Sequence, residues 1–192
     1  MSVENPGEIT QLLEKARNGD KLAENRLAEL IMPELERIAR IILSREYHGN
    51  TMETGDLVNA IYLKLRPDVK TFKDSVHFKA YAARAMHNYL IDKARRVIQR
   101  EKHLGQRADF EEAERVTKGP GGEESLDRAT QLVALAKALQ ELRESDERAA
   151  QVVVLRIGGL TNEEIAVELS VAESTVKRDW RSARALLAMR LG

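Results

Sequence analysis

Residues 160–187 read LTNEEIAVELSVAESTVKRDWRSARALL, and this stretch decides the fold of the second half of the chain. Thr161 followed three residues later by Glu164 is a capping-box pattern, which predicts the start of a short helix. The periodicity breaks at Ser170, where a positive φ is expected at a position often held by Gly, and it resumes in a second helix. Two short helices joined by a tight turn predict a helix-turn-helix unit of the kind that reads DNA.

The second helix of this unit is predicted to have an apolar inner face and a cationic outer face. Val176, Trp180 and Ala183 fall three or four residues apart, so they are expected to pack inward. The outer face offers donors that suit phosphates and guanine edges. Its candidate DNA-binding residues are Ser174, Thr175, Lys177, Arg178, Arg181 and Arg184, with Asp179 as the only acid between Ser174 and Leu191. The alternative interpretation is an ordinary helical bundle in which the arginines form a solvated face.

The composition limits the class of protein. The 192 residues suffice for one or two modest cores, and the 31 basic and 31 acidic residues cancel, so attraction to nucleic acid must come from local patches. The absence of cysteine excludes disulfides, thiolate catalysis and cysteine-ligated metals. No apolar run approaches the ~20 residues of a membrane span, and the N-terminus lacks a signal-peptide core. We therefore expect a cytoplasmic protein with no membrane insertion.

The first half of the chain also has helical periodicity, and no segment shows the alternation of a strand. Its apolar stripes lie at residues 22–42, 57–65 and 78–90. The first stripe starts with Leu22 and is expected to be kinked or divided by Pro33. Tyr81 is assigned to the inward side of the third stripe. The segment that contains this third stripe ends in a basic run.

The clearest break in the periodicity is the sequence TKGPGG at residues 117–122. A stretch rich in Gly and Pro predicts a linker rather than part of a core. We therefore predict an all-α fold of two small helical domains, residues 1–98 and 126–192, joined by a flexible linker at residues 99–125.

Three segments in order resemble the extracytoplasmic-function (ECF) sigma factors, minimal bacterial initiation factors of the sigma-70 family. The sequence DLV at residues 56–58 with YLKL at residues 62–65 resembles region 2.2 of that family. FKAYAARAMHNYLIDKARR at residues 78–96 resembles regions 2.3 and 2.4, and the helix-turn-helix with TVKR at residues 175–178 resembles region 4.2. The resemblance implies a region 2-like helical bundle followed by a region 4-like helix-turn-helix domain.

The resemblance further implies a specificity subunit that binds the RNA polymerase core and directs promoter-specific initiation. Such a protein is not an enzyme and needs no cofactor or metal, because the polymerase supplies the catalysis. The helix at residues 56–65 is implied to dock on the clamp of the largest subunit, with Asp56, Asn59 and Lys64 as core-binding candidates. An anti-sigma factor is a plausible further partner on the same ground.

Two promoter contacts are implied. At the −10 element, Asn88 would read a flipped base, and phosphates would be held by Lys93, Arg95 and Arg96. Asp92 is expected to be structural and to pair with a neighbouring arginine. At the −35 element, the recognition helix would enter the major groove. Base contacts there are assigned to Arg178 and Lys177, and phosphate contacts to Arg181 and Arg184. The linker would leave the two domains loosely coupled or folded onto one another, which would mask DNA binding until the core is engaged.

A stand-alone helix-turn-helix regulator that binds operator DNA as a dimer is the main alternative. It needs a dimer interface, for which the apolar stripe at residues 132–142 is the candidate, whereas the expected use of that stripe is packing within its own domain. An enzyme is disfavoured, because the histidines share no metal-ligand spacing and no glycine loop could cradle a phosphate.

Overall fold

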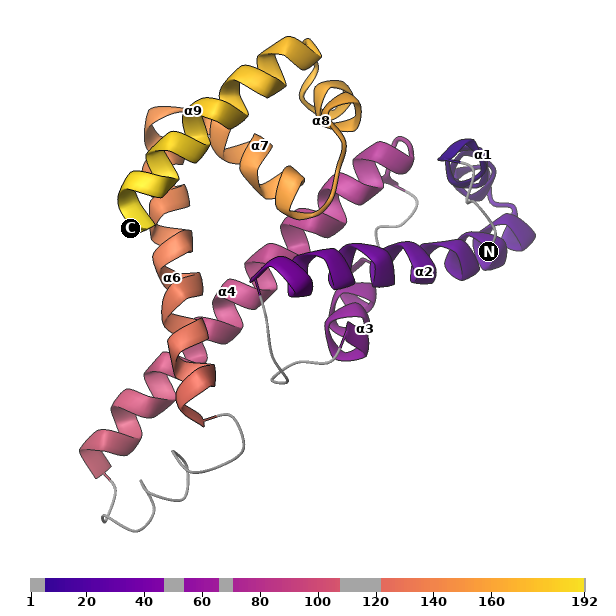
Figure 1. The fold of residues 1–192 in the computed structure, drawn as a ribbon. Coiled ribbons are helices and arrows are strands. Elements are labelled where there is room, and N and C mark those ends of the chain that lie inside the picture. Colours follow the sequence, from indigo (N-terminus) through magenta and orange to yellow (C-terminus); the bar gives the residue numbers. More distant parts are fainter. Residues whose placement is uncertain (1–5, 47–53, 66–70, 108–121, 192) are drawn as a thin grey trace.

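The structure is a computed structural model that describes residues 6–46, 54–65, 71–107 and 122–191. Within these ranges the chain forms eight α-helices and no strand (Figure 1), which confirms the all-α prediction. The helices are α1 (Pro6–Arg17), α2 (Lys21–Glu46), α3 (Thr54–Leu65), α4 (Ser75–Arg107), α6 (Gly122–Ser145), α7 (Glu147–Ile157), α8 (Asn162–Leu169) and α9 (Glu173–Leu191).

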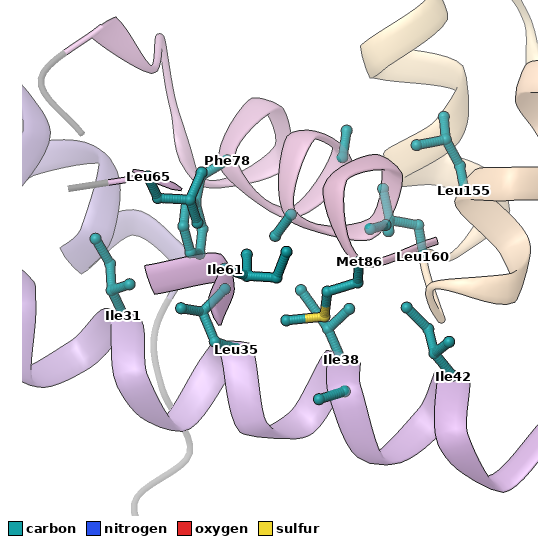
Figure 2. Close-up of a cluster of buried hydrophobic side chains, with 14 of the residues drawn as sticks. Ile31, Leu35, Ile38, Ile42, Ile61, Leu65, Phe78, Met86, Leu155 and Leu160 are labelled. Atoms are coloured by element: carbon teal, nitrogen blue, oxygen red, sulfur yellow. The ribbon is translucent and has the colours of Figure 1, made fainter. Parts of the chain in front are cut away.

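The first half of the fold is built on α2 and α4, against which α1 and α3 pack. Apolar residues of α2 recur at helical spacing and meet α3 and α4 in a common core (Figure 2). The large side chains in this part of the core include Ile31, Leu35, Ile38, Ile61, Leu65 and Phe78. α2 runs through Pro33 as one helix, so Pro33 does not divide the segment.

Two residues assigned to the apolar stripes lie outside the core. Leu22 is 81% exposed, because Ala23 and Leu27 take the inward positions of the first turns of α2. Tyr81 is 40% exposed, although its ring makes an edge contact with Phe72 at a centroid separation of 5.3 Å. Placing these two side chains inward was therefore wrong.

The second half consists of α6 to α9. Its own cluster joins Leu139 and Leu142 of α6 with Ala150 and Val153 of α7 and with Ala183 of α9. Leu132, Leu139 and Leu142 are all buried within the chain. The apolar stripe of α6 is thus used for internal packing.

The two halves pack against each other. The main hydrophobic cluster joins residues of α2 and α4 to Leu155 of α7 and to Leu160, and Figure 2 shows Leu160 close to Met86. The turn between α7 and α8 lies directly on the first half. A Cβ on Gly158 would overlap the Cβ of Ala83, and one on Gly159 would lie 2.6 Å from Ile41 Cδ1.

The helices also extend into the predicted linker. α4 continues to Arg107 and α6 begins at Gly122, so residues 99–107 and 122–125 are helical, whereas residues 108–121 lie outside the described ranges. Ala94 of α4 packs with Ala129 and Leu132 of α6. The first half is therefore joined to the second by helix packing at this end as well as at the turn between α7 and α8.

Candidate nucleic-acid interface

The helix-turn-helix begins with the predicted capping box. The Thr161 hydroxyl accepts a hydrogen bond from the Glu164 N–H at 3.1 Å, and the Glu164 carboxylate accepts one from the Thr161 N–H at 2.9 Å. These bonds satisfy donors that an uncapped helix would leave open. At the other end of α8, Ser170 adopts φ 54° and ψ 46°, which confirms the expected positive φ.

The inner face of α9 holds this helix in place. Val176 and Ala183 are fully buried, and Val176 shares the main cluster with Ile165 and Ala166 of α8. Trp180 is half-buried and packs against both clusters, as its predicted inward position requires. The guanidinium of Arg156 lies 5.0 Å from the centroid of the Trp180 ring. Packing therefore fixes which side of α9 faces outward.

The only acid of α9 between Ser174 and Leu191 points inward. Asp179 is 4% exposed, and its carboxylate accepts hydrogen bonds from Arg148 Nε at 2.6 Å and Arg148 Nη2 at 3.4 Å. The hydrogen bond to Asp179 is the main reason that the pKa of Arg148 is raised above its ordinary value. Sequence reasoning had not singled out Arg148, because 31 residues separate it from its partner.

The outer face of α9 carries the predicted DNA-binding residues. The exposed members are Ser174, Lys177, Arg178, Arg181 and Arg184, and Thr175 is half-buried. Within this set, Lys177 pairs with Glu173 at 3.4 Å, and Arg181 Nε donates to the Lys177 carbonyl at 3.3 Å. At about 100° per residue, Ser174, Lys177, Arg178 and Arg181 share the outward side of α9, and Thr175 and Arg184 lie at its two edges.

A second group of candidates lies on α4. Asn88, Arg95 and Arg96 are exposed and Lys93 is half-buried. Asp92 lies 3.6 Å from Arg95 Nη1, so it pairs with a neighbouring arginine as expected. Side chains of α4, α6 and α7 line a cleft of about 750 Å³, and its walls include Asn88 and Arg95.

A third group lies on the outer face of α3. Asp56, Asn59 and Lys64 are exposed, while the opposite face of the helix is buried in the core. Lys64 Nζ lies 5.7 Å from the centroid of the Tyr89 ring. Leu63 is 69% exposed, and it was not named as a binding candidate from the sequence. Its apolar side chain is off the helix face that carries the buried stripe of α3, and this was a usable signal.

Ion pairs connect α4 to α8 across the two halves. Lys79 Nζ lies 2.9 Å from Glu164 Oε1 and 3.8 Å from Glu34 Oε1, and Arg84 Nη1 lies 2.8 Å from Glu168 Oε1. Burial raises the pKa of Glu164, but hydrogen bonds from the Thr161 N–H and from Lys79 outweigh burial and leave this pKa below its ordinary value. The carboxylate that caps α8 therefore also holds α8 to α4.

The described ranges contain no group of three acidic or histidine side chains placed to hold a metal ion. None of their helices combines the length and the apolar character of a membrane span.

The chain was compared with known protein families and with curated proteins. The profile of the family described as ECF sigma factor matches residues 6–191. Among curated proteins, none matches the chain significantly. The profile covers nearly the whole chain, including all three groups of surface residues described above. The chain therefore belongs to the ECF sigma factor family, whose members are non-catalytic initiation factors of RNA polymerase.

Proposed function

We propose that this chain binds the RNA polymerase core and directs it to promoters through two DNA-contacting surfaces, one for the −10 element and one for the −35 element. The observation that carries the proposal is the helix-turn-helix of α8 and α9, whose buried face fixes the recognition helix while its cations point outward. Family membership supports the polymerase partner. The chain itself performs no bond chemistry in this proposal and needs no cofactor.

The proposed partner of α3 is the clamp of the largest polymerase subunit. Asp56, Asn59 and Leu63 fall at positions i, i+3 and i+7, so they share one face of the helix. That face combines polar groups with one exposed apolar side chain, which gains free energy when a partner buries it. Lys64 flanks the face beside Tyr89.

The proposed −10 contact lies on α4. Promoter opening unstacks bases at a cost of a few kcal/mol per base, so a protein that captures them must offset this cost. Asn88 carries an amide that can both donate to and accept from a base edge, and the nearby cations Lys93, Arg95 and Arg96 suit backbone phosphates. The exposure of Asn88, Arg95 and Arg96 along one helix supports this assignment.

The proposed −35 contact is the outer face of α9 in the major groove. Arg178 and Lys177 are the base-reading candidates, and a bidentate arginine to guanine contributes about 1 to 3 kcal/mol of discrimination. Arg181 and Arg184 lie further along the helix and suit phosphates. Ser174 and Thr175 stand in the first turn, where backbone N–H groups favour a phosphate.

The packed arrangement of the two halves supports masking of promoter binding in the free protein. Elements about 25 base pairs apart are separated by about 85 Å of B-DNA, at about 3.4 Å per pair. α4 and α8 approach to a Cα separation within 8 Å. Few residues separate this contact from Asn88 on one side and from Arg178 on the other. The length of chain available therefore keeps Asn88 and Arg178 less than about 60 Å apart. Both promoter contacts therefore require the halves to separate, and binding to the core is the proposed trigger.

Run-off transcription with purified core polymerase and a genomic promoter pool tests the proposal. Adding the chain should produce discrete start sites that core alone does not use, and the products return the recognised sequences. Arg178→Ala should change the preferred −35 sequence, whereas Arg184→Ala should weaken binding to all sequences alike. Failure to associate with core, together with unchanged initiation, would overturn the proposal. Tight operator binding by a dimer of the chain alone would favour a stand-alone regulator instead.

The same proposal implies a cellular location and a further protein partner. The chain acts in the cytoplasm, where polymerase and promoter DNA meet. Family membership also suggests an anti-sigma factor that binds the free chain and keeps it from core. Capture of such a protein by the tagged chain, followed by loss of run-off activity when it is added back, tests this partner.

A further inference from the structure

Asp179 is the one acid on the part of α9 that is proposed to read DNA, and an exposed carboxylate there would repel phosphates. Its burial removes this repulsion, and Arg148 from the first turn of α7 compensates its charge. Two hydrogen bonds from one guanidinium hold the carboxylate in a single orientation. Asp179 is therefore fixed to α7 as well as to its own helix.

The same carboxylate also faces Arg178. Arg178 Nε lies 3.6 Å from Asp179 Oδ1, which is too long for a hydrogen bond but close enough for electrostatic attraction. Neighbouring residues on an α-helix point about 100° apart, so this pair forms only because the Arg178 side chain reaches back toward the edge of the inner face. The contact involves the Nε side of a guanidinium that also carries two terminal nitrogens.

Within the part of the chain that the structure describes, Arg178 is the one proposed base or phosphate contact whose carboxylate partner is buried and held from another helix. The partner of Lys177 is Glu173, an exposed residue of the same helix. Arg181 and Arg184 have no ion pair within the described ranges. The arrangement Arg148–Asp179–Arg178 thus links the scaffold helix α7 to a single cation of the recognition face.

We propose that Asp179 is a positioning residue for promoter reading. Arg148 holds Asp179 in place, and the Asp179 carboxylate restrains Arg178. The two terminal nitrogens of Arg178 are then left to face a base pair. This inference rests on the proposed function. It adds that discrimination at the base read by Arg178 depends on a carboxylate that does not itself touch DNA. A side chain restrained before binding loses less conformational entropy when it forms a bidentate contact.

The test is selection of −35 sequences from a randomised promoter library by holoenzyme that contains wild-type chain, Asp179→Asn, Arg178→Ala or the double variant. Asp179→Asn keeps the side-chain size, and it should lower discrimination at the base positions affected by Arg178→Ala by at least about threefold, with other positions unchanged. The double variant should discriminate no worse at those positions than Arg178→Ala alone. Glu163→Gln, which removes an exposed carboxylate from α8, is the control for the change in net charge.

The outcomes separate this inference from the proposed function. If Arg178→Ala leaves every preference unchanged, the assignment of Arg178 to base reading fails. If Arg178→Ala alters preference while Asp179→Asn behaves like wild type, or like Glu163→Gln, the positioning role of Asp179 is wrong. Thermal unfolding of each variant chain shows whether its fold persists. Should Asp179→Asn fail to fold, Arg148→Lys provides the second test, because it keeps the charge but lacks the planar fork that orients Asp179.

Discussion

Ser170 is an L-residue in the left-handed backbone region, at φ 54°. This conformation costs an L-residue about 1 to 2 kcal/mol, and glycine avoids it while losing about 0.5 to 1 kcal/mol through its greater freedom in the unfolded chain. We therefore expect Ser170→Gly to raise the free energy of unfolding by roughly 0.5 kcal/mol. Thermal unfolding followed by circular dichroism measures this. Ser170→Ala, which keeps a Cβ, should show no gain, and a less stable Ser170→Gly would contradict the expectation.

Glu164 makes stability depend on acid pH. The fold holds the pKa of this carboxyl below its ordinary value, so the ionised form is favoured in the folded state. Its contribution is present above the unfolded pKa of about 4.5 and is lost as pH falls through the lower folded pKa. Between pH 5 and pH 3, Glu164→Gln should therefore lose less stability than wild type. Urea unfolding at a series of pH values checks this, and equal slopes would refute it.

At this scale the sequence predicted what depends on near neighbours. Thr161 and Glu164 are three residues apart, and the turn at Ser170 follows from its flanking helices, so both were predictable. The burial of Asp179 was not predictable, because it depends on Arg148 in another helix. Leu22 was misassigned because its spacing also fits a stripe, and only the packing of Ala23 and Leu27 decides which side of α2 is inward.

The turn between α7 and α8 depends on glycine for a close approach of two elements. Gly158 has φ −69°, which any residue adopts, so alanine there causes no backbone strain but would overlap Ala83 on α4. Overpacking of this kind typically costs about 1 to 3 kcal/mol. We expect Gly158→Ala to lower the free energy of unfolding by that amount or to move α7 and α8 away from α4. Thermal unfolding and small-angle scattering distinguish the two results.

A matched control for this substitution is Gly55→Ala. Gly55 lies in the first turn of α3 with no atom near enough to meet an added Cβ. Alanine there should leave stability unchanged or raise it slightly, since alanine is the better helix former. If both variants behaved alike, the close approach at Gly158 would not be a determinant of the fold.

Helices and their order were predictable because each carries its own apolar period. The helix ends near the predicted linker were not. α4 extends to Arg107 and α6 starts at Gly122, and Ala94 of α4 packs with Leu132 of α6 near these ends. The sequence signal at residues 117–122 therefore did not predict the ends of the helices that flank residues 108–121.

For the molecule as a whole, the sequence left open whether the halves are loosely coupled or folded together. The contacts that decide this join residues far apart in the sequence, such as Arg84 and Glu168, which are 84 positions apart. No periodicity encodes such a pairing. The same holds for the shared core, in which Leu160 packs near Met86. The three surface groups on α3, α4 and α9 were predictable because each lies on one helix.

The pair of Arg84 and Glu168 allows the packed arrangement to be tested in the free protein. Arg84→Glu places two carboxylates together and Glu168→Arg two guanidiniums, so each should favour separated halves, whereas the double exchange restores an opposite-charge pair. Because the chain has no cysteine, Glu14→Cys and Ala188→Cys, at exposed positions of α1 and α9, accept a fluorescent donor and acceptor specifically. Energy transfer should fall in each single variant and recover in the double variant.

The same variants also test whether the packed halves mask DNA binding. If the closed arrangement limits DNA binding, separation of the halves should raise the affinity of the free chain for its selected −35 duplex by about 3- to 10-fold, which corresponds to about 0.7 to 1.4 kcal/mol of population shift. The double variant should return to the wild-type affinity. If binding to the core separates the halves, as proposed, the affinity of holoenzyme for DNA should be the same for all four proteins. A fall in energy transfer in the single variants without any change in their affinity for DNA would show that packing of the halves does not control access to DNA.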